Sequence, residues 1–225
     1  MVGDVGDDPG ARAVCFSLYA TKNITSGEGG VLTTGEEWAR QARAWSTHGM
    51  SRDAWERTSA SSSWEYEVVL PGFKYNLSDL QAALALSQLH RWQHLQRRRH
   101  EIAAQYSALL ADVAEIELPR ARAHVVHAWH LFPIQLHLAT LTVDRAEFIG
   151  ALREHNIGTS VHFIPLHLQP YYRDRYGWEA DDLPVATGAY HREVSLPIYP
   201  SMTDGDVRDV ARAVRDVVAR HRRSR

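Results

Sequence analysis

The chain has 225 residues, 25 Lys and Arg against 27 Asp and Glu, a formal net charge of −2, and 44% hydrophobic residues. This balance argues against binding to nucleic acid or to an anionic membrane, because both need a basic excess. The single cysteine, Cys15, excludes an internal disulfide, and no apolar run reaches the roughly 18 residues of a membrane span. Because the acidic, glycine-rich start is unlike a signal peptide, the sequence predicts a globular cytoplasmic protein of one large or two small domains.

The first part of the chain predicts two neighbouring strands and a short helix. Residues 14–19 and 30–34 are apolar and β-rich, and a polar, glycine-bearing loop joins them. Thr34 and Glu37, three residues apart, predict a capping box at the start of the helix. Residues 46–71 then predict a long loop, which is either functional or a surface excursion held by its aromatic side chains.

A long helical stretch occupies the middle of the chain. Ser78 and Gln81 form a second predicted capping box, and neither Gly nor Pro occurs from Ser78 to Leu118. Leucines recur at helical spacing through this stretch, which predicts one long helix or two helices joined by a kink near residues 97–99. Those three residues are arginines, and we interpret the run as a solvated face rather than a ligand site.

The remainder predicts a compact α/β unit. Its expected elements are a half-buried strand at 134–138, a helix capped by Asp144 and Glu147 and ending at Gly158, a β-rich stretch at 159–164, and a last helix opened by Thr203 and Asp206.

Lys22 is the side chain that most suggests chemistry. It follows a predicted buried strand and precedes a loop rich in Gly, Ser and Thr. Partial burial of a lysine favours its neutral amine, which is the nucleophile in Schiff-base chemistry, and such a loop can hold a phosphate. A lysine beside a phosphate-holding serine is what a pyridoxal phosphate (PLP) site needs. An exposed loop lysine is the other interpretation that the spacing allows.

Histidines and aromatic residues offer weaker alternatives. The 13 histidines include His127 and His130, three residues apart, and His162 and His167, five apart, from which a zinc site could be built. No Cys pair or HExxH helix accompanies them, so we expect packed or surface histidines and no metal. The aromatic stretch from Trp55 to Tyr66 could stack a nucleotide base, or could serve core or interface contacts.

Residues 15–30 carry a specific resemblance. Their sequence, Cys-Phe-Ser-Leu-Tyr-Ala-Thr-Lys-Asn-Ile-Thr-Ser-Gly-Glu-Gly-Gly, closely resembles the lysine motif of the DegT/DnrJ/StrS family of PLP-dependent sugar-nucleotide aminotransferases. Six further segments are similar to family motifs, in the family's order and over nearly the whole chain. They are residues 48–49, 51–55, 71–83, 127–132, 158–165 and 195–200.

The resemblance implies an α/β fold like that of aspartate aminotransferase, PLP fold type I. Residues 1–95 would be the C-terminal part of the PLP-binding large domain, with a dimer-interface loop and the start of the long helix. Residues 96–225 would be the complete small α/β domain. The implied reaction is PLP-dependent transamination of a keto sugar nucleotide. The Lys-Tyr-Asn variant at 74–76 and the segment 127–132 favour a UDP-linked 4-keto sugar, with glutamate as the amino donor.

By the same resemblance, Lys22 would join the aldehyde of PLP and then move protons on the substrate carbon. Ser17 would bind the cofactor phosphate. Asn76 would reach a phosphate of the partner subunit, because the family's sites lie at a homodimer interface. Many relatives carry Asn and Arg where this chain has Lys74 and Asn76, so either residue could reach the cofactor. The residues implied in the substrate pocket are His48, Lys74 and His162.

One departure from the family is large. Relatives have a longer stretch before the lysine motif, which supplies the aspartate beneath the pyridine nitrogen, whereas 21 residues precede Lys22 here. Asp4, Asp7 and Asp8 are too near to take that role. The chain is therefore expected to be the C-terminal part of an aminotransferase with an exposed sheet edge that promotes association. The alternative is a catalytically inactive remnant, or a partner subunit of an intact aminotransferase.

Overall fold

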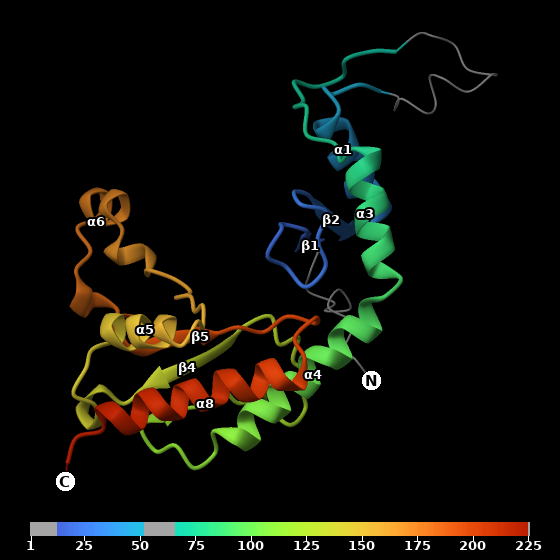
Figure 1. Ribbon diagram of the computed structural model, residues 1–225. Coiled ribbons are helices and arrows are strands. Elements are labelled where there is room, and N and C mark those ends of the chain that lie inside the picture. The colour runs from blue at the N-terminus through green and yellow to red at the C-terminus, as the bar shows by residue number, and fades with distance from the viewer. Residues whose placement is uncertain (1–12, 52–65, 225) are drawn as a thin grey trace. The chain divides into compact units, whose positions relative to one another are not determined.

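The computed structural model describes residues 13–51 and 66–224, in two compact units that divide between Trp92 and Gln93 (Figure 1). The assignment of residues 1–95 and 96–225 to a PLP-binding domain and a small domain stays a prediction. Asp4, Asp7 and Asp8, and Trp55 with most of the predicted long loop, lie outside the described residues. None of the described helices is long and apolar enough to cross a membrane.

The first unit begins with a two-stranded antiparallel sheet. Strand β1 (Ala13–Ser17) pairs with β2 (Gly30–Thr34), and Ser17 lies opposite Gly30. Strand β1 ends two residues earlier than predicted. After Ser17 the Leu18 N–H still donates to the Gly29 carbonyl at 2.9 Å, but Tyr19 forms only an isolated parallel bridge with Gly27.

Helix α1 (Glu36–Ser46) follows β2 directly. Its N-cap is Gly35, which makes no side-chain capping bond, so the capping box predicted for Thr34 and Glu37 is wrong. The physical reason is that Thr34 is still part of β2, where it pairs with Ala13.

The long helical stretch forms two helices, α3 (Asp79–Leu89) and α4 (Trp92–Leu109). The capping box of Ser78 and Gln81 is confirmed. The predicted kink near residues 97–99 is wrong, because the break comes at residues 90–91, where the Arg91 N–H bonds to the Gln88 carbonyl three residues back.

The second unit is built on a three-stranded antiparallel sheet in the order β3 (Ile116–Glu117), β4 (Phe132–Leu136) and β5 (Glu193–Leu196). Helix α4, α5 (Arg145–Glu154) and α8 (Asp204–His221) pack with this sheet around one core (Figure 1). Its fully buried side chains include Ile102, Tyr106, Phe132, Ile134, Phe148, Leu152, Val194, Val207 and Val214. This unit therefore has a closed hydrophobic core.

The capping boxes that open α5 and α8 are confirmed, with Asp144 and Thr203 as the N-caps. Gly158 does not end α5; the helix ends at Glu154, and Asn156 takes the left-handed conformation with φ 61°. Residues 159–164 form a single bridge, Ser160 to Ser195, instead of a strand.

Five short helical segments of this unit were not predicted. They are η1 (Leu138–Thr140), η2 (Leu166–Leu168), α6 (Pro170–Tyr176), η3 (Ala180–Asp182) and α7 (Pro184–Arg192). Proline starts both α6 and α7, a position where its missing N–H costs nothing.

The arginine run at 97–99 is largely structural. Arg99 is 6% exposed and donates from Nη1 to the carbonyls of Trp129 and Ile198, each at 3.0 Å. Burial lowers the pKa of its guanidinium. Arg98 donates to the Met202 carbonyl and to Asp204. The predicted solvated face thus holds for Arg97 alone, which is exposed.

Asp112 should make the stability of this unit depend on acid pH. Two hydrogen bonds from Arg215 lower the pKa of its carboxyl from 3.8 to about 2. A lowered carboxyl pKa adds stability above the ordinary value, and this stability is lost as the pH falls toward about 2. We expect the wild type to lose stability faster than Asp112→Asn over this range. Urea unfolding of both proteins at several pH values measures the difference, and parallel curves would contradict the prediction.

Candidate active site

Lys22 lies in a tight turn just after β1. The Lys22 N–H donates to the Tyr19 carbonyl at 2.9 Å, and Leu18, which precedes the turn, is buried. The Thr25 hydroxyl donates to the Leu18 carbonyl at 2.9 Å, and the Ser26 hydroxyl donates to the Glu28 carbonyl at 2.7 Å. The loop hydroxyls that suggested a phosphate cradle therefore hold the turn in shape.

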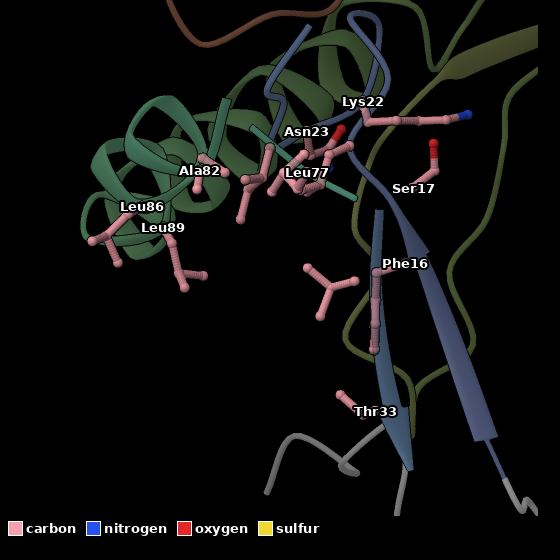
Figure 2. A pocket seen from close by; sticks show the side chains of 13 residues that line it. Phe16, Ser17, Lys22, Asn23, Thr33, Leu77, Ala82, Leu86 and Leu89 are labelled. Atoms are coloured by element: carbon pink, nitrogen blue, oxygen red, sulfur yellow. The ribbon is translucent and has the colours of Figure 1, made fainter. Parts of the chain in front are cut away.

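Ser17 and Lys22 line one groove of about 610 Å³ in the first unit. Figure 2 shows their side chains at one end of it, directed away from Leu86 and Leu89 of α3. Lys22 is half-buried and Ser17 is exposed. The rest of the lining is mainly apolar and contains no acidic residue: Phe16, Leu18, Asn23, Ile24, Val31, Thr33, Leu77, Ala82, Ala85, Leu86 and Leu89.

The exposed apolar side chains of this groove should make the chain self-associate. Leu86 is 53% exposed and Leu89 is 51% exposed, and contiguous apolar surface of this kind drives association. We expect Leu86→Lys to shift the sedimentation profile toward the monomer. Gln41→Lys, at an exposed position of α1, adds the same charge elsewhere. An equal shift from both substitutions would contradict a role for the groove.

Lys22 and Lys74 are the two lysines of the whole sequence. Any lysine chemistry of this chain must therefore involve one of these two amines. Because the sequence has only these two lysines, a substitution of Lys74 is a matched control for the same substitution of Lys22.

A second group of predicted site residues lies where residues 47–50 and 70–74 run together. The His48 N–H donates to the Phe73 carbonyl at 2.8 Å, and Thr47 forms a bridge with Lys74. The Lys74 amine donates to the Asn76 side-chain oxygen. His48, Lys74 and Asn76 thus come together in one exposed cluster.

Glycine permits this close approach. Gly49 has φ 73°, and a Cβ added there would lie 1.8 Å from the Leu70 carbonyl oxygen. A Cβ added at Gly72 would lie 2.2 Å from the Gly49 nitrogen. Both positions therefore require glycine for the two segments to meet.

His162 belongs to the second unit and is half-buried. Its Nδ1 lies 2.8 Å from the Ser195 hydroxyl. Because His162 and Lys22 belong to different units, a common substrate pocket for the two residues stays a prediction.

Glu193 and Ser195, which lie behind His162, were not identified as site residues from the sequence. The available signal was a glutamate in the otherwise mostly apolar strand Glu-Val-Ser-Leu. An acidic side chain in a buried strand requires a polar partner.

Several histidines that suggested zinc have structural roles. His127 accepts a hydrogen bond from the Trp129 N–H at 3.0 Å, and Nε2 of His167 lies 2.8 Å from the Thr187 hydroxyl. Within residues 13–51 and 66–224, no group of three or more His, Cys, Asp or Glu is placed to hold a metal ion.

Comparisons with known proteins agree with the resemblance in the sequence. Residues 1–215 match the model of the DegT/DnrJ/EryC1/StrS aminotransferase family. The spore coat polysaccharide biosynthesis protein SpsC of Bacillus subtilis (strain 168) is 50% identical over 220 residues, which are 97% of this chain and 55% of SpsC. The chain thus spans about half the length of the curated relatives it matches.

Two solved structures show the same fold. PseC of Helicobacter pylori, an aminotransferase involved in the biosynthesis of pseudoaminic acid, has a TM-score of 0.83 and 27% identity, covering 93% of this chain and 54% of PseC. Spr1654 of Streptococcus pneumoniae in its PMP form has a TM-score of 0.83 and 28% identity, with the same coverage, and it was also solved in a PLP form. The predicted type I PLP fold is confirmed, and this chain belongs to the DegT/DnrJ/EryC1/StrS family of PLP-dependent aminotransferases.

Proposed function

We propose that this chain supplies the lysine and a phosphate-binding serine of a PLP-dependent enzyme that aminates a keto sugar nucleotide. The observation that carries the proposal is the shared groove of Ser17 and Lys22 in a member of this family. The backbone turn at Tyr19–Lys22 fixes where the Lys22 side chain leaves the main chain, and this side chain and Ser17 both line the groove.

The residues at this end of the groove fit part of what PLP requires. When bound, PLP supplies an aldehyde and an electron sink for the substrate carbon. The Lys22 amine would hold PLP through its aldehyde carbon and would carry a proton to or from the substrate carbon. The Ser17 hydroxyl would donate to a phosphate oxygen of the cofactor. Among the residues that the structure describes, none that lines the groove is acidic, so they supply no carboxylate for the pyridine nitrogen.

The proposed substrate is a UDP-linked 4-keto sugar, and the proposed donor is glutamate. The names of two relatives, SpsC in spore coat polysaccharide biosynthesis and PseC in pseudoaminic acid biosynthesis, support a sugar substrate. The UDP link, the 4-keto group and the glutamate donor rest on the sequence resemblance at residues 74–76 and 127–132. His48, Lys74 and His162 would contact the substrate, and Lys74 or Asn76 would reach the cofactor phosphate of a partner subunit. Residues 1–95 would belong to the PLP-binding domain and 96–225 to the small domain.

Exposed aromatic residues support the proposed homodimer. Phe73 and Tyr75 are 57% and 63% exposed and flank Lys74. Aromatic side chains of this kind are enriched in protein interfaces. A partner subunit that covers them would bring a second chain close to Lys74 and Asn76.

The alternative function is that of an inactive remnant or a partner subunit of an intact aminotransferase. It is favoured by the groove, whose described lining residues include no Asp or Glu.

An amination assay distinguishes the two functions. The full chain is incubated with PLP, glutamate and a UDP-4-keto sugar, alone and together with the part of SpsC that it does not match. We expect amination in the mixture, and its loss when the chain carries Lys22→Ala. If this part of SpsC and the chain associate but form no amino sugar, the result would favour the inactive alternative.

Removing the Ser17 hydroxyl should weaken cofactor binding. A hydrogen bond to a charged group contributes about 1.5–3 kcal/mol, so we expect Ser17→Ala to raise the Kd for PLP by roughly tenfold or more. The control is Thr33→Ala, which removes a hydroxyl from the same groove at β2. Fluorescence titration with PLP measures both, and equal Kd values for Ser17→Ala and the wild type would contradict the assignment.

A further inference from the structure

A buried carboxylate lies directly behind His162. Glu193 and Ser195 are 6% and 3% exposed, and both project from β5. One carboxylate oxygen of Glu193, Oε2, accepts the backbone N–H of His162 at 2.9 Å. The other, Oε1, accepts the Ser195 hydroxyl, and Nδ1 of His162 lies 2.8 Å from that same hydroxyl. The three residues form one continuous hydrogen-bonded chain.

Backbone hydrogen bonds hold the segments that carry His162, Ser195 and Glu193 in place. The Ser195 N–H donates to the Ser160 carbonyl at 2.8 Å, and the Ser160 N–H donates back to the Ser195 carbonyl at 3.2 Å. Glu193 pairs with Gln135 of the central strand β4. His162 and Glu193 are among the residues that line a cavity of about 330 Å³ in this unit. His162 is therefore fixed by hydrogen bonds to Glu193 and Ser195, and it borders the cavity.

The direction of each hydrogen bond follows from the chemistry of the partners. A backbone N–H can only donate, and a carboxylate can only accept. The Ser195 hydroxyl must therefore give its one hydrogen to Glu193. Its oxygen is then left as an acceptor, which requires that His162 carry a hydrogen on Nδ1. In the neutral imidazole, Nε2 is then bare.

We propose that Glu193 and Ser195 are positioning residues that fix this tautomer of His162, so that its Nε2 accepts a hydrogen bond from a hydroxyl group of the substrate. This inference rests on the proposed function, which places His162 in the substrate pocket. A bare ring nitrogen selects a hydrogen donor, such as a sugar hydroxyl, over a phosphate oxygen, which can only accept.

Nitrogen NMR of the full chain tests the tautomer. The protein is labelled with ¹⁵N in its histidine rings, and the His162 signals are those that disappear in His162→Gln. At a pH where this ring is neutral, we expect the chemical shift of a protonated nitrogen for Nδ1 and that of a bare nitrogen for Nε2. A bare Nδ1 and a protonated Nε2 in the wild type would overturn the proposal, and this result needs no substitution at Glu193 or Ser195.

Glu193→Gln gives the sharpest test because it keeps the shape of the side chain. The amide oxygen must still accept the His162 N–H, so the amide NH₂ faces Ser195 and donates to it. The Ser195 hydroxyl then donates to Nδ1, and the hydrogen of His162 moves to Nε2. We expect this reversal in Glu193→Gln and a mixture of tautomers in Ser195→Ala, each in protein whose amide spectrum matches the folded wild type. An unchanged tautomer in either folded variant would overturn the proposal.

The substrate part is tested with UDP-glucose and with inorganic phosphate as separate probes. We expect UDP-glucose to shift the Nε2 signal of the wild type and phosphate to leave it in place. A shift with phosphate but none with UDP-glucose would overturn the hydroxyl assignment. None of these signals depends on PLP, so failure of PLP to bind at Lys22 would refute the proposed function while leaving the tautomer to be decided by NMR.

Discussion

Lys22→Ala is expected to remove the visible absorbance band that PLP gains when a lysine amine condenses with its aldehyde. The expected loss is complete, because Lys22 supplies the amine beside Ser17 in the groove and no neighbouring side chain can replace a primary amine. The measurement is an absorbance titration of the full chain with PLP.

The second lysine supplies the control for this titration. Lys74 is exposed and hydrogen-bonded to Asn76, and we expect Lys74→Ala to keep the band with at most a change in affinity. A band that persists in Lys22→Ala and disappears in Lys74→Ala would show that the assignment of the reactive lysine is reversed.

Arg99→Met is expected to lower the free energy of unfolding of the second unit by about 3 kcal/mol. The substitution leaves the carbonyls of Trp129 and Ile198 inside the protein without the donor that now bonds to both, and each unsatisfied buried acceptor costs about 1–3 kcal/mol. Part of this cost is offset, because folding of the variant no longer removes a charged guanidinium from water. Urea unfolding of the full chain, followed by circular dichroism, measures the change.

Arg97→Met is the matched control for Arg99→Met. It makes the same chemical change two residues earlier on α4, where the side chain is exposed, and surface changes of this kind stay within about 0.5 kcal/mol. Similar unfolding midpoints for the two variants would contradict a structural role for Arg99.

Capping-box patterns in the sequence predicted a helix start correctly wherever no distant contact altered the backbone at that point. The capping boxes at Ser78, Asp144 and Thr203 are confirmed, because each depends only on residues three apart. The box at Thr34 failed because pairing with Ala13 across the sheet extends β2 to that residue. A contact of this kind is distant in sequence and cannot be read from a four-residue pattern.

The arginine run shows the same limit for buried charge. Arg97, Arg98 and Arg99 are chemically alike in sequence, yet Arg99 alone is buried. Its partners, Trp129 and Ile198, lie 30 and 99 residues away. Only the fold, which brings the residues just before β4 and just after β5 against α4, distinguishes the core arginine from its exposed neighbour.

The candidate site was predictable in part. Lys22 and Ser17 lie within one motif, and the structure places both on the same groove. The support behind His162 was not predicted, because Glu193 and Ser195 come from a strand more than 30 residues along the chain. The prediction for the loop at 46–71 lies mostly outside the described residues, so its role stays a prediction.

The central claim is that PLP joins the amine of Lys22, and reductive trapping tests it most directly. Borohydride reduces the bond between PLP and an amine to a stable link, and peptide mass spectrometry then locates the added mass. With two lysines in the sequence, the possible positions are Lys22, Lys74 and the N-terminal amine. We predict a stoichiometric adduct on the peptide that contains Lys22, and an adduct confined to Lys74 or to the N-terminus would contradict the account.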